Sequence, residues 1–160
     1  MKTLVAILLI AGVIPGAPAL GQSPAASLLL GRWAVDVARL PIPPATRPRS
    51  VTITFSDASK NKLTMDVDII DASGAEIHST GTAPLDGSAV SVKGSPEADI
   101  AAMKQPQPGV LIVALGKGGI PASTRTYAAA PDGKTLVETA SYFGNDGRPI
   151  MRTNYFKRVR

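Results

Sequence analysis

The chain has 160 residues, of which 44% are hydrophobic and 4% aromatic, and it contains 15 Gly, 14 Pro and no Cys. This length fits one small domain, and the absence of cysteine excludes a disulfide scaffold and a zinc ribbon. The net charge is +5, but the basic residues are scattered along the chain, so no basic block indicates a nucleic-acid partner.

The N-terminal segment has the three-part pattern of a secretory signal peptide. Lys2 supplies a positive charge, an apolar run follows, and small residues come after it. The run is too short to cross a bilayer comfortably, and Pro15 and Pro18 break the helix that a membrane span would need. We expect residues 1–21 to be removed and residues 22–160 to be a periplasmic or secreted domain with no stable membrane insertion.

Alternation of apolar and polar residues, bounded by Gly, Pro, Asn and Asp clusters, predicts strands along nearly all of the remaining chain. The expected strands are 32–38, 50–56, 62–71, 75–83, 88–93, 109–115, 123–130, 134–143 and 149–159. Short turns join them, so consecutive strands should pair antiparallel. An open meander would leave two long unpaired edges. We therefore predict an all-β, antiparallel up-and-down barrel of 8–9 strands with one short helix.

Two segments depart from the strand pattern. Residues 40–49 contain four prolines and should form a long, extended first loop. Within residues 94–109, Ser95 can cap a short helix that has Pro96 at its first position and ends before Pro106. Such a helix would lie at one end of the barrel, either as a lid over a ligand or as a crossover that plugs the bottom.

A short motif near the start of the barrel resembles a known family. Gly31-Arg32-Trp33 is similar to the Gly-x-Trp signature that opens the first strand of lipocalins and other calycin barrels. The Asp-Gly hairpins and the basic C-terminal end also resemble that family. Its Thr-Asp-Tyr motif is absent, so the resemblance is to a distant bacterial member. The resemblance implies that an arginine of the last strand packs against Trp33. Arg158 is the expected partner, with Arg152 and Arg160 as alternatives.

The hairpin around residues 72–74 should place Asp68 opposite His78, the only histidine. A carboxylate beside a histidine is compatible with a metal site or an acid–base pair. The other face of this hairpin is clearly apolar, however, so the pair is expected to point to solvent. We therefore assign no metal site to it.

The last hairpins offer a second polar cluster. The turn at 145–147 pairs Glu138 with Asn154, and it places Tyr142 and Arg152 on the same face. The turn at 131–133 allows two registers. One adds Arg125 and Tyr127 to this face, and the other adds Thr124, Thr126 and Ala128. If the face points inward, Glu138 and Arg152 could satisfy each other in a cavity; if it points outward, it is an exposed ladder. The candidate ligand-binding residues are Arg125, Tyr127, Glu138, Tyr142, Arg152 and Asn154.

Motifs of stronger chemistry are not found in the sequence. There is no Gly-x-Ser-x-Gly elbow, no His-Glu-x-x-His and no cysteine nucleophile. Residues 116–119 lack the flanking residues of a phosphate-binding loop, and residues 66–71 lack the spacing of a calcium loop. No catalytic residue and no cofactor are therefore assigned.

Together these features predict an exported, lipocalin-like barrel that binds a small hydrophobic or amphipathic molecule. One alternative is an enzyme that isomerises, cyclises or hydrolyses a small molecule with Glu138, Tyr142 and Arg152, or with Asp68 and His78. Another is an envelope protein whose barrel is filled by its own side chains and whose loops bind a protein. A hollow interior would favour ligand binding.

Export generates the first testable prediction. When the chain is expressed in a bacterial host with a C-terminal tag, the purified protein should begin at Gln22, or at Leu20 if cleavage follows Ala19. Intact-mass measurement of the periplasmic and culture fractions checks this. A protein that keeps Met1 and stays in the cytoplasm would contradict the signal-peptide prediction.

Overall fold

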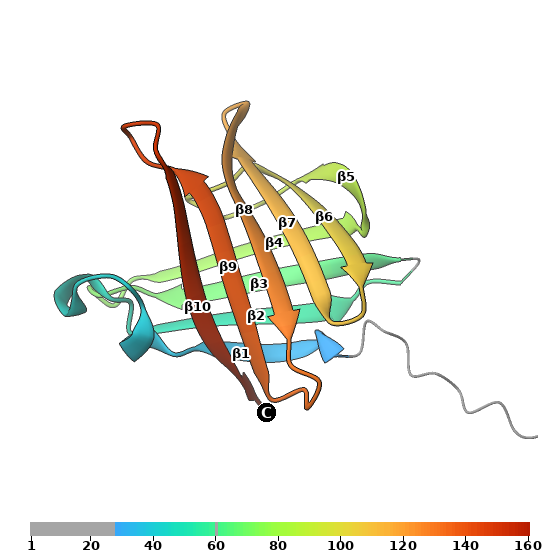
Figure 1. Ribbon diagram of the computed structural model, residues 1–160, viewed down its shortest axis with the longest axis horizontal. Helices are drawn as coiled ribbons and strands as arrows, with labels where there is room; N and C mark the ends of the chain where they lie inside the picture. Colours follow the sequence, from blue (N-terminus) through green and yellow to red (C-terminus); the bar gives the residue numbers. More distant parts are fainter. Residues whose placement is uncertain (1–27, 60) are drawn as a thin grey trace, which may run out of the picture.

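The computed structural model describes residues 28–59 and 61–160, and the expected signal peptide, 1–21, lies outside this part. The described chain forms one antiparallel sheet in the strand order β4-β3-β2-β1-β10-β9-β8-β7-β6-β5 (Figure 1). Its strands are β1 (Gly31–Val35), β2 (Ser50–Asp57), β3 (Lys62–Ile70), β4 (Glu76–Pro84), β5 (Asp86–Ser91), β6 (Ile100–Gln107), β7 (Val110–Lys117), β8 (Ile120–Ala129), β9 (Thr135–Phe143) and β10 (Pro149–Val159). No helix in the described ranges is long and apolar enough to cross a membrane.

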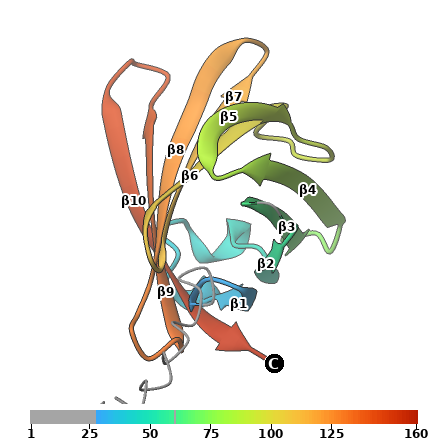
Figure 2. The same ribbon diagram turned by 90° about the vertical axis from the view of Figure 1, so that its right-hand side faces the viewer.

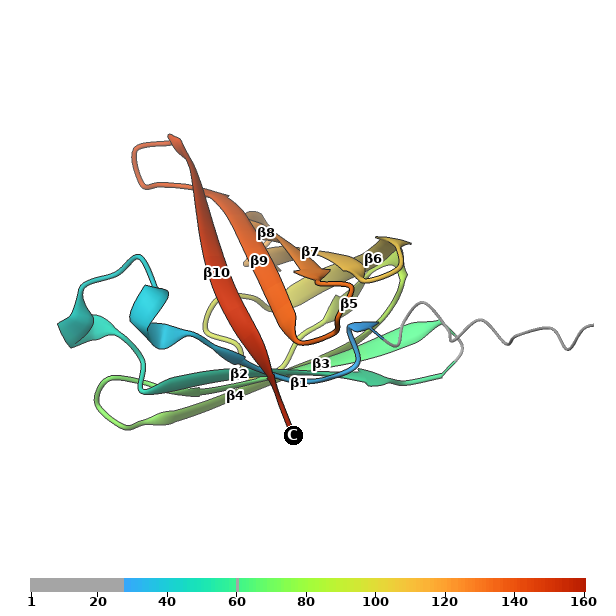
Figure 3. The ribbon, with the colours of Figure 1, turned by 60° about the horizontal axis from the view of Figure 1, so that its bottom comes forward.

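The sheet curls into a nearly closed barrel, as the sequence pattern predicts, with ten strands in place of eight or nine. β1 pairs with both β2 and β10, which brings the first and last strands of the described chain together inside the sheet. Figures 2 and 3 show β1–β4 on one side and β6–β10 on the other. The two edge strands, β4 and β5, are connected through Leu85, and the segment after β5 pairs with β4 where Thr80 and Lys93 exchange backbone hydrogen bonds of 3.0 Å.

Aromatic residues pack together at the end of the barrel where β1 crosses β10. Trp33, Phe55, Tyr127 and Phe156 are all buried there. The Tyr127 ring contacts Phe55 and Phe156 edge-on, at centroid distances of 5.4 and 6.4 Å. The Trp33 indole N–H donates to the Leu29 carbonyl at 2.8 Å, so its polar atom is satisfied. The interior at this end of the barrel is therefore filled by these side chains.

Arg158 of β10 binds the N-terminal end of β1, in a set of contacts that we call the clasp. Of the three arginines considered as partners of Trp33, it is the one whose guanidinium lies over the indole, 4.1 Å from the centroid. It also donates to the carbonyl oxygens of Leu28, Leu30 and Gly133, at 2.7, 2.5 and 2.5 Å. A Cβ at Gly31, where φ is +117°, would lie 2.5 Å from its Nη1, so this approach requires glycine.

The prediction of a short helix within residues 94–109 is wrong, because half of that segment is strand β6 and no helix is present in the rest. Ser95 does cap a turn, since its Oγ accepts from the backbone N–H groups of Glu97 and Ala98, each at 3.2 Å. After that turn, burial alternates with period two: Ala101 and Met103 are both 2% exposed and face the interior. Pairing with β7 satisfies the backbone of the strand, and Pro106 lies at a register irregularity that tolerates its missing N–H.

The first loop also differs in detail from the sequence prediction. β1 ends at Val35, before the predicted boundary at residue 38. The proline-rich segment contains two short 3-10 turns, η2 (Val37–Arg39) and η3 (Pro44–Thr46), in an otherwise extended chain. Pro44 occupies the first position of η3, where its fixed φ suits the turn and no N–H is needed.

The clasp predicts a specific loss of stability. Arg158→Gln should lower the free energy of unfolding by about 3 kcal/mol, because charge-assisted hydrogen bonds to the three carbonyls are lost. Urea unfolding followed by the fluorescence of Trp33, the only tryptophan, measures the change. Arg160→Gln removes the same charge from an exposed position and should shift stability by less than about 0.5 kcal/mol. Equal effects of the two variants would contradict the clasp.

Candidate functional site

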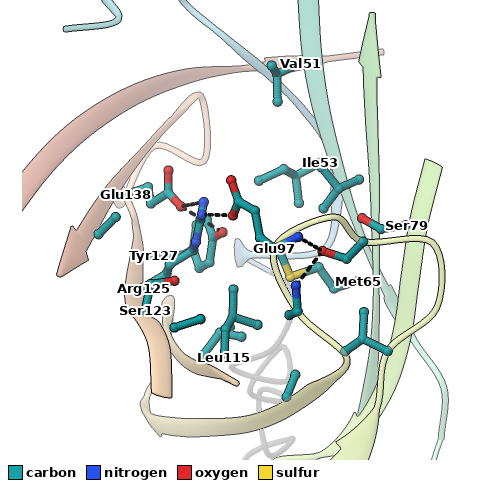
Figure 4. A pocket seen from close by; sticks show the side chains of 18 of the residues that line it. Val51, Ile53, Met65, Ser79, Glu97, Leu115, Ser123, Arg125, Tyr127 and Glu138 are labelled. Atoms are coloured by element: carbon teal, nitrogen blue, oxygen red, sulfur yellow. Dashed lines mark hydrogen bonds and ion pairs between the residues drawn. The ribbon is translucent and has the colours of Figure 1, made fainter. Parts of the chain in front are cut away.

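A cavity of about 560 Å³ lies in the barrel beside the aromatic core, and Tyr127 and Phe156 border both. One wall is apolar and is formed by alternate side chains of β2 and β3, namely Val51, Ile53, Met65, Val67 and Ile69. The facing wall comes from β8, β9 and β10 and is polar (Figure 4). Its polar side chains are Arg125, Tyr127, Glu138, Tyr142, Arg152 and Asn154. All six candidate residues from the sequence therefore line one cavity.

Glu138 is the centre of the polar wall. Its side chain is only 2% exposed. Oε1 accepts hydrogen bonds from Arg125 Nη1 at 2.9 Å and from the Tyr127 hydroxyl at 3.0 Å, and Oε2 accepts one from Asn154 Nδ2 at 2.7 Å. Three donors and one positive charge thus compensate the buried carboxylate.

Strand register brings these donors together. Glu138 of β9 lies directly opposite Tyr127 of β8 on one side and Asn154 of β10 on the other. Of the two registers open from the sequence, the structure has the one that adds Arg125 and Tyr127 to the Glu138 face. The chain makes this connection through residues 131–134, where Asp132 Oδ1 accepts from the Lys134 N–H at 2.9 Å.

Arg152 does not form the expected pair with Glu138. Its guanidinium lies over the ring of Tyr142, with Cζ 5.2 Å from the centroid. Asn154 and Tyr127, the direct strand neighbours of Glu138, and Arg125, a diagonal neighbour on β8, bind the carboxylate instead. Arg152 is exposed and lies at the rim of the cavity.

Burial and charge keep the network in one protonation state. Complete burial raises the pKa of Tyr127 well above its ordinary value, and the negative charge of Glu138 raises it further. Burial opposes the charge on Arg125, but the neighbouring carboxylates of Glu138 and Glu97 outweigh burial and raise its pKa. Tyr127 is therefore a protonated donor and Arg125 a permanent cation.

Three buried polar atoms of the wall have no hydrogen-bond partner among the described residues: Arg125 Nε, Tyr142 Oη and Asn154 Oδ1. The first is a donor, the second can donate or accept, and the third is an acceptor. Buried polar groups in native proteins are nearly always paired, so unpaired ones in a cavity wall call for a partner. The wall can thus bind the polar end of another molecule.

Glu97 is a site residue that sequence reasoning missed. It lies in the segment between β5 and β6, and its Oε2 pairs with Arg125 Nη2. The segment passes so close to β4 that a Cβ at Gly94 would lie 2.1 Å from the His78 carbonyl oxygen. Ser95 caps a turn as its sequence context predicts. Nothing in the sequence spacing, however, indicates that Glu97 contacts Arg125 on the distant strand β8.

Asp68 and His78 pair across β3 and β4 as predicted, with Oδ1 and Nδ1 2.7 Å apart. Their side chains are 49% and 60% exposed, and neither lines the cavity. Among the described residues, no group of three or more His, Asp or Glu side chains could hold a metal ion.

No protein-family model matches the chain, and no curated protein sequence matches it. Among solved structures, a similar chain is described as "Structure of EF1p2_mFAP2b bound to DFHBI". The two chains are 14% identical with a TM-score of 0.45, and the match covers 84% of this chain and 97% of that one. At this level of similarity, the match assigns no role to any residue of this chain.

The raised pKa of Tyr127 predicts a loss of stability in alkali. Above pH 10 the unfolded chain releases the phenol proton while the folded chain keeps it, so stability falls as pH rises. Between pH 10 and 11.5, the free energy of unfolding of the wild type should fall more steeply than that of Tyr127→Phe, by up to about 1.4 kcal/mol per pH unit. Urea unfolding of both proteins measures the two slopes. Parallel slopes would show that Tyr127 titrates normally in the folded protein.

Proposed function

We propose that the barrel binds a small molecule that has an apolar body and a polar end. The observation that carries the proposal is the cavity of about 560 Å³, whose apolar wall faces a polar wall with three unpartnered atoms. Its volume lies within the range of about 300–1,000 Å³ that is usual for ligand pockets. A barrel filled by its own side chains would not contain such a space.

An opening between two hairpins supports access to this cavity. β8 and β9 pair only from Thr124 to Ala129 and from Leu136 to Ser141, although both strands continue further. Beyond these pairs the β7–β8 and β9–β10 hairpins diverge, which is clear in Figure 2. Tyr142 lies at this divergence and lines the cavity. We propose this divergence as the route by which a ligand reaches the polar wall.

Binding is favoured over catalysis by Glu138 because the carboxylate is already occupied. Its two oxygens accept three hydrogen bonds, which fill three of the roughly four lone-pair sites of a carboxylate and leave little room for a substrate proton. The other acid–base candidate, Asp68 with His78, lies outside the cavity. The same groups suit a binding wall, because a satisfied network holds Arg125 and Asn154 in place.

We also propose a distant relationship to lipocalin-like barrels and an exported location. The relationship is supported by the contact of Gly31 and Trp33 with Arg158, which the sequence resemblance implied. The location is supported by the sequence pattern of residues 1–21 alone. Both fit a barrel that carries a small amphipathic molecule in the periplasm or the medium.

The proposal predicts saturable binding of a neutral apolar dye. N-phenyl-1-naphthylamine should bind one-to-one with a rise in fluorescence. Val67→Trp should weaken this binding by about tenfold or more, because the larger side chain fills the cavity. Asp66→Trp adds the same side chain to the opposite face of β3 and should bind the dye as the wild type does. Absent saturation in the wild type, or equal binding by both variants, contradicts the proposal.

A further inference from the structure

Arg125 holds two carboxylates that differ greatly in their exposure to solvent. Glu138 is 2% exposed and pairs with Nη1, whereas Glu97 is 63% exposed and pairs with Nη2. The guanidinium between them is 23% exposed. One partner therefore belongs to the barrel interior and the other to the surface.

The two pairs differ in how easily they separate. Removing Arg125 from Glu138 would leave a buried charge without compensation, which is strongly unfavourable. Glu97 loses little when it leaves, because exposed ion pairs are screened by solvent and contribute weakly to stability. Of the two, the contact of Arg125 with Glu97 is thus the one that an incoming anion can replace.

The geometry of the guanidinium indicates which anion fits. In arginine, Nε–H and one terminal amino group point along the same edge, and together they match the two oxygens of a carboxylate. In Arg125, Nη1 is occupied by Glu138, Nη2 carries Glu97, and Nε is buried with no partner among the described residues. Glu97 therefore uses only part of the free edge.

We propose, on the basis of the binding function above, that the ligand carries a carboxylate and displaces Glu97 from Arg125. The ligand carboxylate takes both Nε and Nη2, and its apolar body lies against Met65, Val67 and the rest of the apolar wall. One carboxylate replaces another, so the charge around Arg125 is unchanged. A dianionic phosphate would instead add negative charge beside Glu138, which disfavours it.

The exchange requires little movement of the chain. Figure 4 shows Glu97 extending from its own segment toward Arg125 and Glu138. The segment is anchored before Glu97 by the backbone bonds between Thr80 and Lys93, and after it by Asp99 Oδ2, which accepts from the Gly118 N–H at 2.9 Å. Rotation of the Glu97 side chain is therefore enough to free the guanidinium edge.

Displacement of bound N-phenyl-1-naphthylamine by decanoate and by decanamide at pH 8 tests the proposal. The two probes share a chain length and differ in the charge of the head. Wild-type protein should prefer decanoate by about tenfold, and Glu97→Gln should strengthen decanoate binding severalfold without strengthening decanamide binding. Glu76→Gln removes the same charge from an exposed position on β4 and should leave both affinities unchanged.

A second variant separates the head-group site from the cavity. Arg125→Gln combined with Glu138→Gln removes both members of the buried pair, so no uncompensated charge remains. In this double variant the preference for decanoate over decanamide, measured as the ratio of the two affinities, should be lost. A preference that survives in it would place the carboxylate elsewhere and overturn the proposal.

The remaining outcomes distinguish the two hypotheses. If the dye binds but decanoate and decanamide displace it equally, the cavity function stands and the carboxylate proposal fails. Unchanged or weaker decanoate binding by Glu97→Gln overturns the displacement of Glu97. If the dye and both probes all fail to bind, the proposed function itself fails.

Discussion

The buried carboxylate of Glu138 is the constraint on which the polar half of the barrel depends. A charge removed from water needs partners that reach it without distortion, and each of its partners lies on a strand adjacent to β9. A slip of one residue between β8 and β9 would turn Tyr127 and Arg125 outward and leave the carboxylate with Asn154 as its one remaining donor. The network therefore fixes register as well as lining the cavity.

One end of the barrel is closely packed, and the other end holds a cavity. Where β1 crosses β10, Trp33 and its aromatic neighbours fill the interior, and Arg158 binds backbone carbonyls around them. Toward the diverging hairpins, the interior is open and its polar groups are only partly satisfied. The packed end supplies stability that lets the open end keep unpaired groups, a division common at functional sites.

Local patterns in the sequence predict most of this structure. Alternation identifies the strands, and the 145–147 turn places Glu138 opposite Asn154, because a hairpin register depends on nearby residues alone. The errors arise where distant contacts decide. Ser95 caps a turn as a helix start would, yet pairing with β7 makes the following residues a strand. Glu97 reaches Arg125 across the barrel, and Arg152 turns to Tyr142, which no spacing in the sequence indicates.

The bridge between Thr80 and Lys93 gives the barrel a seam. Elsewhere around the circumference, neighbouring strands are held by ladders of several residue pairs, whereas the seam is held by the chain connection at Leu85 and by the two backbone hydrogen bonds of this isolated bridge. Widening the ring at the seam breaks those two bonds and leaves every ladder intact. A change in diameter at the seam would leave the register of the polar wall unchanged, because β8, β9 and β10 lie in the middle of the strand order. The fold therefore separates the part of the ring that can adjust from the part that holds the buried charges.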